Sequence, residues 1–263
     1  MPGVALFGVT GRMGQSLVRA LRDSPLHLAG ALASSASGRL GLDAAEQGTP
    51  TGVRVTADPK TALRGAAVAL DFSAPLGLGA HAGACAALGV PLLVGTTGFD
   101  SNTRAMLEAA ARVVPVLIAP NTSVGVGVLQ ELVSLAAGAL GEGFDAEIGE
   151  AHHRLKRDAP SGTALALGEA VAAARGTALA DVAVYGRHGL SDPRTPGSIG
   201  FSVVRAGDIV GEHTVTFAAV GERLELTHRA TDRMVFARGA LKAAEWLIGR
   251  PAGVYGMRHV LGL

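Results

Sequence analysis

A glycine-rich turn near the start of the chain is the feature that most constrains its fold. The run Gly8-Val9-Thr10-Gly11-Arg12-Met13-Gly14 directly follows an apolar segment, Val4 to Phe7, and opens a helix-like segment, Met13 to Leu21. Short apolar runs then keep alternating with helix-like stretches, as strands buried on both faces of a parallel sheet do. The remaining runs are Leu28 to Leu32, Ala67 to Phe72, Pro91 to Val94 and Val114 to Ile118. We therefore predict a Rossmann-type parallel sheet of about five strands in the first part of an α/β protein.

The pattern changes after Asn121 and predicts a second, α+β domain with a mixed or antiparallel sheet. An apolar helix is expected from Val126 to Leu140, a strand around Ala146 to Glu150 and a helix from Thr163 to Ala174. Period-two alternation then predicts an antiparallel meander with one polar face. Its three strands are Ile199 to Arg205, Ile209 to Phe217 and Arg223 to Arg229, after a loop from Tyr185 to Gly197. Helical spacing returns from Met234 to Ile248, in an element that can pack on either domain. The expected division is 1–123, 124–233 and a C-terminal segment, 234–263.

Composition excludes several classes of protein. The 23 basic and 22 acidic residues nearly cancel and form no basic block, so we expect no nucleic-acid partner. Charged residues interrupt the apolar runs too often for a membrane span. The single cysteine, Cys85, cannot form an internal disulfide and is expected to be a small buried hydrophobe. With no signal-like segment before the first strand, we expect a cytoplasmic protein.

The glycine-rich turn predicts dinucleotide binding, because it lets backbone amides approach a pyrophosphate at a helix N-terminus. The candidate residues are Gly8, Val9, Thr10, Gly11, Arg12 and Met13. At the end of the second strand, where an acid usually binds the ribose of NAD, the sequence reads Ala31 to Ser37 without one. Ser34 and Ser35, with Arg12 or Arg39, can instead bind a 2′-phosphate, which favours NADPH over NADH. The alternative is that the serines only solvate a turn and leave no preference.

Two more loops follow predicted strands and are candidates to hold the rest of the cofactor. They are Gly95-Thr96-Thr97-Gly98-Phe99 and Ala119-Pro120-Asn121-Thr122-Ser123. Ligands of open α/β sheets bind at the carboxyl ends of strands, where such loops meet. The candidates are Gly95, Thr96, Thr97, Ala119, Pro120, Asn121 and Thr122, although each loop taken alone can be an ordinary turn.

The densest cluster of functional side chains runs from Glu150 to Ala164 and contains two adjacent histidines. Ser161-Gly162-Thr163 precedes an alanine-rich helix and forms a second anion site, suited to a carboxylate. Hydride transfer to a C=C or C=N bond must be completed by a proton, for which His152 or His153, and also Lys156, are suitable donors. The cluster thus predicts a nicotinamide-dependent reductase of a small anionic substrate. The alternatives are a solvated basic loop or a zinc site, but the residues lack a familiar ligand spacing and we expect no metal.

The run EAHHRLKRDAPSGTA, with GVTGRMG, DFSAP, GTTGF and APNTSVG, resembles the 4-hydroxy-tetrahydrodipicolinate reductase (dihydrodipicolinate reductase) family of diaminopimelate and lysine biosynthesis. The similarity covers essentially the whole chain. It implies that His152 is the proton donor and acceptor, that Lys156 is a proton donor, and that the substrate's carboxylates are held by His153 and the turn Ser161, Gly162 and Thr163. It further implies a Rossmann domain completed by the C-terminal helix, a substrate domain whose sheet builds a homotetramer, and use of NAD(P)H on a small dicarboxylate. Many members carry Glu and often Arg where this chain has Ala33-Ser34, which is why NADPH is expected to be preferred.

Two other functions are compatible with parts of this pattern. One is a different Rossmann-type reductase of an imine or semialdehyde, but a semialdehyde dehydrogenase needs a nucleophilic cysteine and Cys85 lies in an apolar run. The other is a catalytically silent NADPH sensor or scaffold. His152 and Lys156 beside an anion site argue against the sensor, which needs no proton donor.

Overall fold

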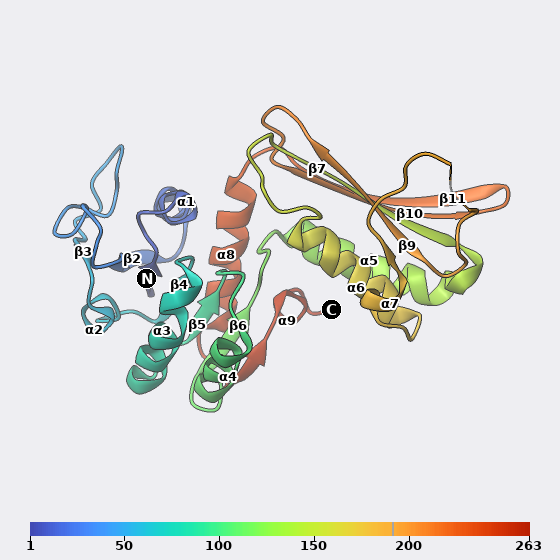
Figure 1. The fold of residues 1–263 in the computed structure, drawn as a ribbon. Coiled ribbons are helices and arrows are strands. Elements are labelled where there is room, and N and C mark those ends of the chain that lie inside the picture. The colour runs from blue at the N-terminus through green and yellow to red at the C-terminus, as the bar shows by residue number, and fades with distance from the viewer. Residues whose placement is uncertain (191) are drawn as a thin grey trace. The chain divides into compact units, whose positions relative to one another are not determined.

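The computed structural model describes residues 1–190 and 192–263 and divides the chain into two compact units. The first unit consists of Met1–Val124 and Met234–Leu263, and the second consists of Gly125–Arg233 (Figure 1). The chain therefore leaves the first unit once, builds the second, and returns.

The first unit is built on a seven-stranded sheet in which every pairing is parallel. Its order is β12-β6-β5-β4-β1-β2-β3. The strands are β1 (Gly3–Phe7), β2 (His27–Leu32), β3 (Val55–Thr56), β4 (Val68–Asp71), β5 (Leu92–Val94), β6 (Pro115–Ile118) and β12 (Gly253–Tyr255). The predicted Rossmann-type class is confirmed. About five strands were predicted in the first 120 residues, and the structure has six there, because β3, with two residues, is too short to show a period. The seventh strand, β12, comes from the C-terminal segment.

Helices cover both faces of this sheet, which is why its strands are apolar throughout. One core cluster includes Leu17 of α1 and Ala240 and Leu247 of α8, and the other includes Leu78 of α3 and Leu107 of α4. The helices are α1 (Arg12–Ala20), α2 (Pro59–Ala62), α3 (Pro75–Leu88), α4 (Ser101–Ala110), α8 (Met234–Leu247) and α9 (Met257–Leu261), with a 3-10 turn at Leu21–Asp23. The C-terminal helix α8, whose partner the sequence left open, packs in this unit.

The second unit holds a five-stranded mixed sheet in the order β11-β10-β7-β9-β8. The strands are β7 (Asp145–His152), β8 (Ala183–Val184), β9 (Ile199–Arg205), β10 (Gly211–Ala219) and β11 (Glu222–Ala230). The predicted three-stranded meander is wrong: β10 and β11 form an antiparallel hairpin, but β7 lies between β10 and β9, and β9 runs parallel to β7. Alternation of apolar and polar residues identifies a strand with one polar face, but it does not show which strand pairs with it.

Helices α5 (Val124–Leu140) and α6 (Gly162–Ala174) lie along one face of this sheet (Figure 1), with α7 (Leu179–Val182) and a 3-10 turn at Gly141–Gly143. Leu129 and Val133 of α5 pack with Leu167 of α6 against Ile148 and Phe217 of the sheet. The segment Val124–Gly143 is long and apolar enough, by length and composition alone, to cross a membrane, as are many core helices. Its buried residues are part of the core of the second unit.

The expected loop from Tyr185 to Gly197 includes residue 191, which lies outside the described residues. Within the described part, Arg194 anchors the loop to β7. Its Nε lies 2.9 Å from Asp145 Oδ1, and its guanidinium also pairs with Glu147.

Candidate active site

The glycine-rich turn connects β1 to α1, and two of its glycines are sterically required. Gly8 has φ +78°, and a Cβ there would lie 2.5 Å from the Phe72 carbonyl oxygen. A Cβ on Gly14 would lie 2.4 Å from the Gly8 carbonyl oxygen. Gly11, which precedes the helix, has no side chain with which to cap it, and no acid occupies the first turn. The first N–H groups of α1 therefore lie at the end of a tight glycine turn, and this arrangement is suited to binding an anion.

The order of the strands brings the predicted cofactor segments to one edge of the first sheet. The chain moves outward from β1 to β2 and β3 on one side and from β4 to β5 and β6 on the other, so the crevice between β1 and β4 is the topological switch point. All these strands are parallel, so the loops after them share an edge. Gly8–Gly11, Gly95–Thr97 and Ala119–Thr122 lie in those loops, and Arg12 and Met13 begin α1 directly after the first of them.

Asp71, the last residue of β4, connects two of these loops, and the sequence analysis gave it no role. Its buried carboxylate accepts hydrogen bonds from the Ser73 amide (2.9 Å) and hydroxyl (2.7 Å), the Thr96 hydroxyl (2.7 Å) and His81 Nδ1 (2.6 Å). Burial alone would raise the pKa of Asp71, but the hydrogen bonds from His81 and Ser73 lower it below its ordinary value. Asp71 is thus an ionised residue that fixes the loops after β4 and β5.

The loop after β6 is held by α8. The Thr122 hydroxyl donates to the Phe236 carbonyl oxygen at 2.7 Å, and a Cβ on Gly239 would lie 1.8 Å from the Thr122 carbonyl oxygen. The close approach of helix and loop therefore depends on Gly239.

The end of β2 is more constrained than the sequence analysis expected. The Ser34 hydroxyl accepts a hydrogen bond from the Ala36 amide at 3.2 Å, forming a local turn. Arg39 donates to the carbonyl oxygens of Asp43 (2.8 Å) and Ala45 (3.1 Å), within its own loop. Of the two candidate arginines, Arg12 is exposed at the start of α1.

In the second unit, His152 ends β7 and belongs to a buried hydrogen-bonded group. Its Nδ1 lies 2.6 Å from Glu150 Oε2. Glu150 also accepts from both terminal nitrogens of Arg205, at 2.7 and 2.8 Å, and from the Ser161 amide at 3.0 Å. Because an ionised carboxylate only accepts, the proton of the neutral ring is on Nδ1 and Nε2 is the free nitrogen.

Burial and charge set the protonation of this group. Burial alone would raise the pKa of Glu150, but hydrogen bonds from Arg205 and His152 lower it. Burial lowers the pKa of His152; Glu150 opposes this effect, whereas Lys156 and Arg205 add to it. At neutral pH, therefore, Glu150 is ionised and His152 is neutral in the free protein.

Lys156 lies in the loop of residues 153–160, which follows His152. Its Nζ is 2.8 Å from Asp158 Oδ2, and the Asp158 carbonyl oxygen accepts a hydrogen bond from Arg205 at 2.6 Å. At the start of the loop, the Arg154 amide donates to the Gly207 carbonyl oxygen at 3.2 Å. The loop is therefore held at both ends, and His153 within it is half-buried.

The predicted anion turn begins α6. The Ser161 hydroxyl caps the helix by accepting from the Ala164 amide at 3.2 Å, and it also lies 3.0 Å from His213 Nε2. Gly162 and Thr163 are the first two residues of the helix. A Cβ at Gly162 would meet only open space. The Ser161 side chain is thus engaged with the helix and with His213, whereas the Gly162 position borders open space.

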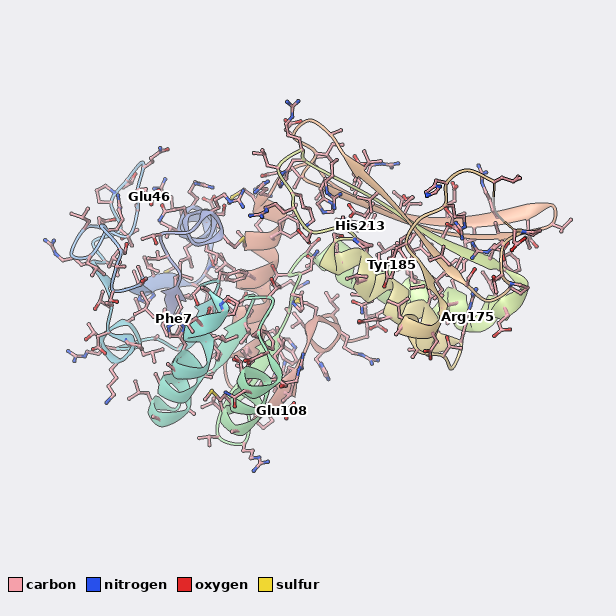
Figure 2. The ribbon with its side chains drawn as sticks, in the orientation of Figure 1. Phe7, Glu46, Glu108, Arg175, Tyr185 and His213 are labelled. Carbon is pink, nitrogen blue, oxygen red and sulfur yellow. The ribbon has the colours of Figure 1, made fainter. Side chains whose placement is uncertain are left out.

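Three residues of this group were missed from the sequence: Glu150, Arg205 and His213. Glu150 and His152 are two apart on one strand, so they share a face, and this signal was available. Arg205 pairs in register with His152, and His213 with Glu150, but only because β7 lies between β9 and β10. The His213 ring packs edge-on against that of His152, with centroids 5.1 Å apart, and burial lowers its pKa to about 4 (His213 is labelled in Figure 2).

Across residues 1–190 and 192–263, we find no group of three or more His, Cys, Asp or Glu side chains arranged to hold a metal ion. Cys85 is buried in α3 with a free thiol.

Comparison with known proteins identifies relatives of the whole chain. Residues 3–122 match the family model "Dihydrodipicolinate reductase, N-terminus", and residues 125–261 match "Dihydrodipicolinate reductase, C-terminus". The chain is 53% identical over 262 residues to a 4-hydroxy-tetrahydrodipicolinate reductase from Thiobacillus denitrificans, covering 99% of this chain and 98% of that one. It is 52% identical over 266 residues to the enzyme of the same name from Anaeromyxobacter dehalogenans, covering 100% and 98%.

Among solved structures, a dipicolinate-bound dihydrodipicolinate reductase from Paenisporosarcina sp. TG-14 superposes with a TM-score of 0.79 at 25% identity, covering 98% of this chain and 99% of that one. An amine dehydrogenase from Mycobacterium smegmatis, with a TM-score of 0.59 at 14% identity and coverage of 96% and 94%, shares the fold.

Proposed function

The chain belongs to the dihydrodipicolinate reductase family, and from that premise we propose how its two units divide the reaction. The reaction is the reduction of 4-hydroxy-tetrahydrodipicolinate to tetrahydrodipicolinate, an oxidoreductase activity of diaminopimelate and lysine biosynthesis. The hydroxylated substrate loses its 4-hydroxyl as water and gains one hydride and one proton. The first unit holds a reduced nicotinamide dinucleotide, and the second unit holds the dicarboxylate and supplies its proton.

The first unit fits a dinucleotide at the switch point of its sheet. Gly8 and Gly14 let the turn pack more closely than any side chain would allow, and the start of α1 offers its N–H groups to the pyrophosphate. The loops Gly95–Thr97 and Ala119–Thr122 hold the nicotinamide end. When bound, the cofactor supplies the hydride.

The second unit fits a small dianion. The N–H groups of Gly162 and Thr163 bind one carboxylate at the start of α6, with Ser161 fixing the turn. His153 and Lys156 add donors from the adjoining loop. Two carboxylates brought beside His152 raise its pKa, because nearby negative charge favours the protonated ring.

Proton delivery follows from that change. His152 is neutral before the substrate binds, takes up a proton at Nε2 as the dianion arrives, and returns it to the reduced carbon skeleton. Lys156 acts as a second donor. The observation that carries this assignment is the 2.6 Å contact between His152 Nδ1 and Glu150, which leaves Nε2 for the proton transfer.

A direct assay tests the activity. The purified protein is given NADPH and the condensation product of pyruvate and aspartate semialdehyde, and loss of reduced-nicotinamide absorbance is followed. We expect turnover with this product only. Equal turnover with simple semialdehydes, or binding of NADPH without any turnover, contradicts the proposal.

We also propose that NADPH is the better cofactor. Ser34, Ser35 and Arg12 offer donors to a 2′-phosphate and no carboxylate repels it, whereas Arg39 is engaged within its own loop. Two charge-assisted hydrogen bonds, discounted for exposure, give about a ten- to hundredfold preference in kcat/KM. Ser34→Asp is expected to shift the ratio toward NADH, and Ser37→Asp serves as a control in the same loop. A ratio near one in the unmodified protein would mean that the serines only form a turn.

Assembly is proposed to be a homotetramer built through the second sheet. The face opposite α5 and α6 carries mostly polar side chains, including the Thr214–Thr227 and Glu212–Arg229 pairs. Arg187 and Arg194 of the loop before β9 reach Glu147 on this face, and α5 and α6 cover the apolar face. Light scattering at micromolar concentration tests this state, and a monomer would contradict it. A cytoplasmic location is part of the same proposal.

A further inference from the structure

Glu150, which is buried, and Arg205, which is partly buried, form an ion pair on neighbouring strands of the second sheet. The Glu150 side chain is 1% exposed and that of Arg205 19%, and Arg205 binds the carboxylate through two nearly equal hydrogen bonds. Burying a carboxylate has a desolvation cost that an ion pair often only balances, so stability alone seldom explains such a pair. Stability therefore does not explain why this ion pair lies beside His152, which pairs with Arg205 in the strand register.

We propose that Glu150 and Arg205 are a positioning pair that holds His152 with its proton on Nδ1 and keeps Nε2 available to the substrate. This inference rests on the proposed role of His152. Glu150 acts on the ring directly, and Arg205 acts through Glu150. Arg205 also donates to the Asp158 carbonyl oxygen, so the same side chain anchors the loop that carries Lys156.

The pair also balances charge around the ring. The charged and titratable groups that face His152 are Glu150 on β7, Arg205 on β9, His213 on β10, and Lys156 and Asp158 in the adjoining loop; His228 on β11 lies beyond His213. Glu150 raises the pKa of His152, whereas Arg205 lowers it. Glu150 can thus fix the tautomer without forcing the ring to hold a second proton before the substrate arrives.

This balance predicts opposite effects from removing each partner. Glu150→Gln removes the negative charge and is expected to lower the pKa of His152 by about one unit or more. Arg205→Gln removes the positive charge and leaves Glu150 unopposed, so it is expected to raise the pKa of His152, by less than Glu150→Gln lowers it, because Glu150 acts on the ring more strongly than Arg205 does. Arg205→Lys keeps the charge and loses the two-pronged geometry, so its pKa shift should be smaller than that of Arg205→Gln.

The first measurement needs no variant. Nitrogen NMR of the histidine rings in the unmodified protein, with His152 assigned by its loss in His152→Gln, reports which ring nitrogen holds the proton at neutral pH. We expect Nδ1. A proton on Nε2 would overturn the proposal, even if Glu150→Gln proves unable to fold.

The second measurement titrates the His152 ring in each variant and records the pH dependence of kcat. Arg229→Gln is the matched control, because Arg229 pairs with Glu212 on the same sheet at 3.2 Å but is exposed and does not face His152. We expect opposite shifts for Glu150→Gln and Arg205→Gln, the same directions in the kcat profile, and no shift for the control. If both variants shift the pKa of His152 in the same direction, or neither shifts it, Glu150 and Arg205 do not position His152 for catalysis and have only a structural role.

The two measurements separate failure of this inference from failure of the proposed function. If His152→Gln keeps its kcat, the catalytic assignment fails while the tautomer and titration results still stand. If His152→Gln loses activity but the variants do not shift the ring in opposite directions, the catalytic role holds and the positioning role fails.

Discussion

Each unit contains one buried carboxylate that contacts a histidine Nδ1 at 2.6 Å: Asp71 with His81 in the first, Glu150 with His152 in the second. The other partners of the two carboxylates differ. Asp71 is surrounded by hydroxyl and amide donors from its own loops, and within residues 1–190 and 192–263 it forms an ion pair with His81. Glu150 is bound by a guanidinium from another strand.

The surroundings of the two histidine rings also differ. The His81 ring packs on Phe7 of the core, with centroids 4.8 Å apart (Phe7 is labelled in Figure 2). The His152 ring lies at a strand end beside His213, Lys156 and the start of α6. One contact distance therefore accompanies two tasks. The first pair shapes backbone loops, and the second, in the function proposed above, controls a proton.

The largest expected difference between the pairs is in kcat. His152→Gln should lower kcat by roughly 10² to 10⁴, the usual range for loss of a general acid or base. His81→Gln should leave kcat at saturating cofactor within a few-fold of the unmodified value and act mainly on cofactor KM. Steady-state kinetics of both variants measure the contrast. An unchanged kcat in His152→Gln, or equal losses in both, would break the comparison.

The two anion sites should respond differently to an added methyl group. Gly14→Ala places a Cβ against the Gly8 and Val9 backbones, so the turn must shift, and we expect at least a tenfold weaker cofactor affinity together with lower stability. Gly162→Ala meets open space and should leave stability unchanged or slightly higher. Its effect, if the turn binds a carboxylate closely, is on substrate KM alone. Titration calorimetry with cofactor and thermal unfolding of both variants test the pair. If Gly14→Ala binds the cofactor normally, the glycine-rich turn is not the site that binds the cofactor's pyrophosphate.

Asp71 should make a pH-dependent contribution to stability. Its pKa is lower in the folded protein than in the unfolded chain, so its contribution is fully present above the ordinary pKa and is lost as pH falls through the lowered one. Asp71→Asn is expected to cost about 1 to 3 kcal/mol at neutral pH, because it removes a charged acceptor from several donors. The loss should shrink as pH falls below about 4. Denaturant unfolding across this pH range measures it, and a pH-independent loss would assign the effect to packing.

The substitution expected to change activity least is at Cys85 in α3. Burial, reinforced by the charge of Asp71, raises the pKa of this thiol to about 12. The folded protein should therefore react with thiol reagents at mildly alkaline pH roughly 10³-fold more slowly than the unfolded chain. In Asp71→Asn the rate should rise modestly, while Cys85→Ala should leave activity unchanged. Rapid labelling of the folded protein would contradict the burial of this helix face.

The sequence predicted the first unit better than the second for a physical reason. Strands buried on both faces are apolar throughout, and helices of several turns separate them, so β1, β2, β4, β5 and β6 were recognisable. β12 has three residues and lies after the whole second unit. In the second unit, alternation located β9, β10 and β11 but could not show that β7 separates β9 from β10.

The same limit applies to the candidate site. His152, Lys156 and the Ser161–Thr163 turn lie in one continuous run, so their joint chemistry was visible. Arg205 and His213 reach His152 from opposite sides of β7, and no local pattern places them there. The charged groups around His152 come from β9 and β10, and the spacing of residues along one strand does not show which strands lie beside it.

The pairing of β12 with β6 ties the completion of the first unit to the last stage of synthesis on the ribosome. While residues 125–233 are being translated, β6 remains an open sheet edge, and the face that α8 covers stays exposed. The second unit, by contrast, is continuous in the chain and can fold as soon as it emerges. Loss of β12 and α8 would therefore damage the first unit even though residues 1–124 were intact. For the same reason, a chaperone has more apolar surface to protect on the N-terminal unit than on the one that follows it.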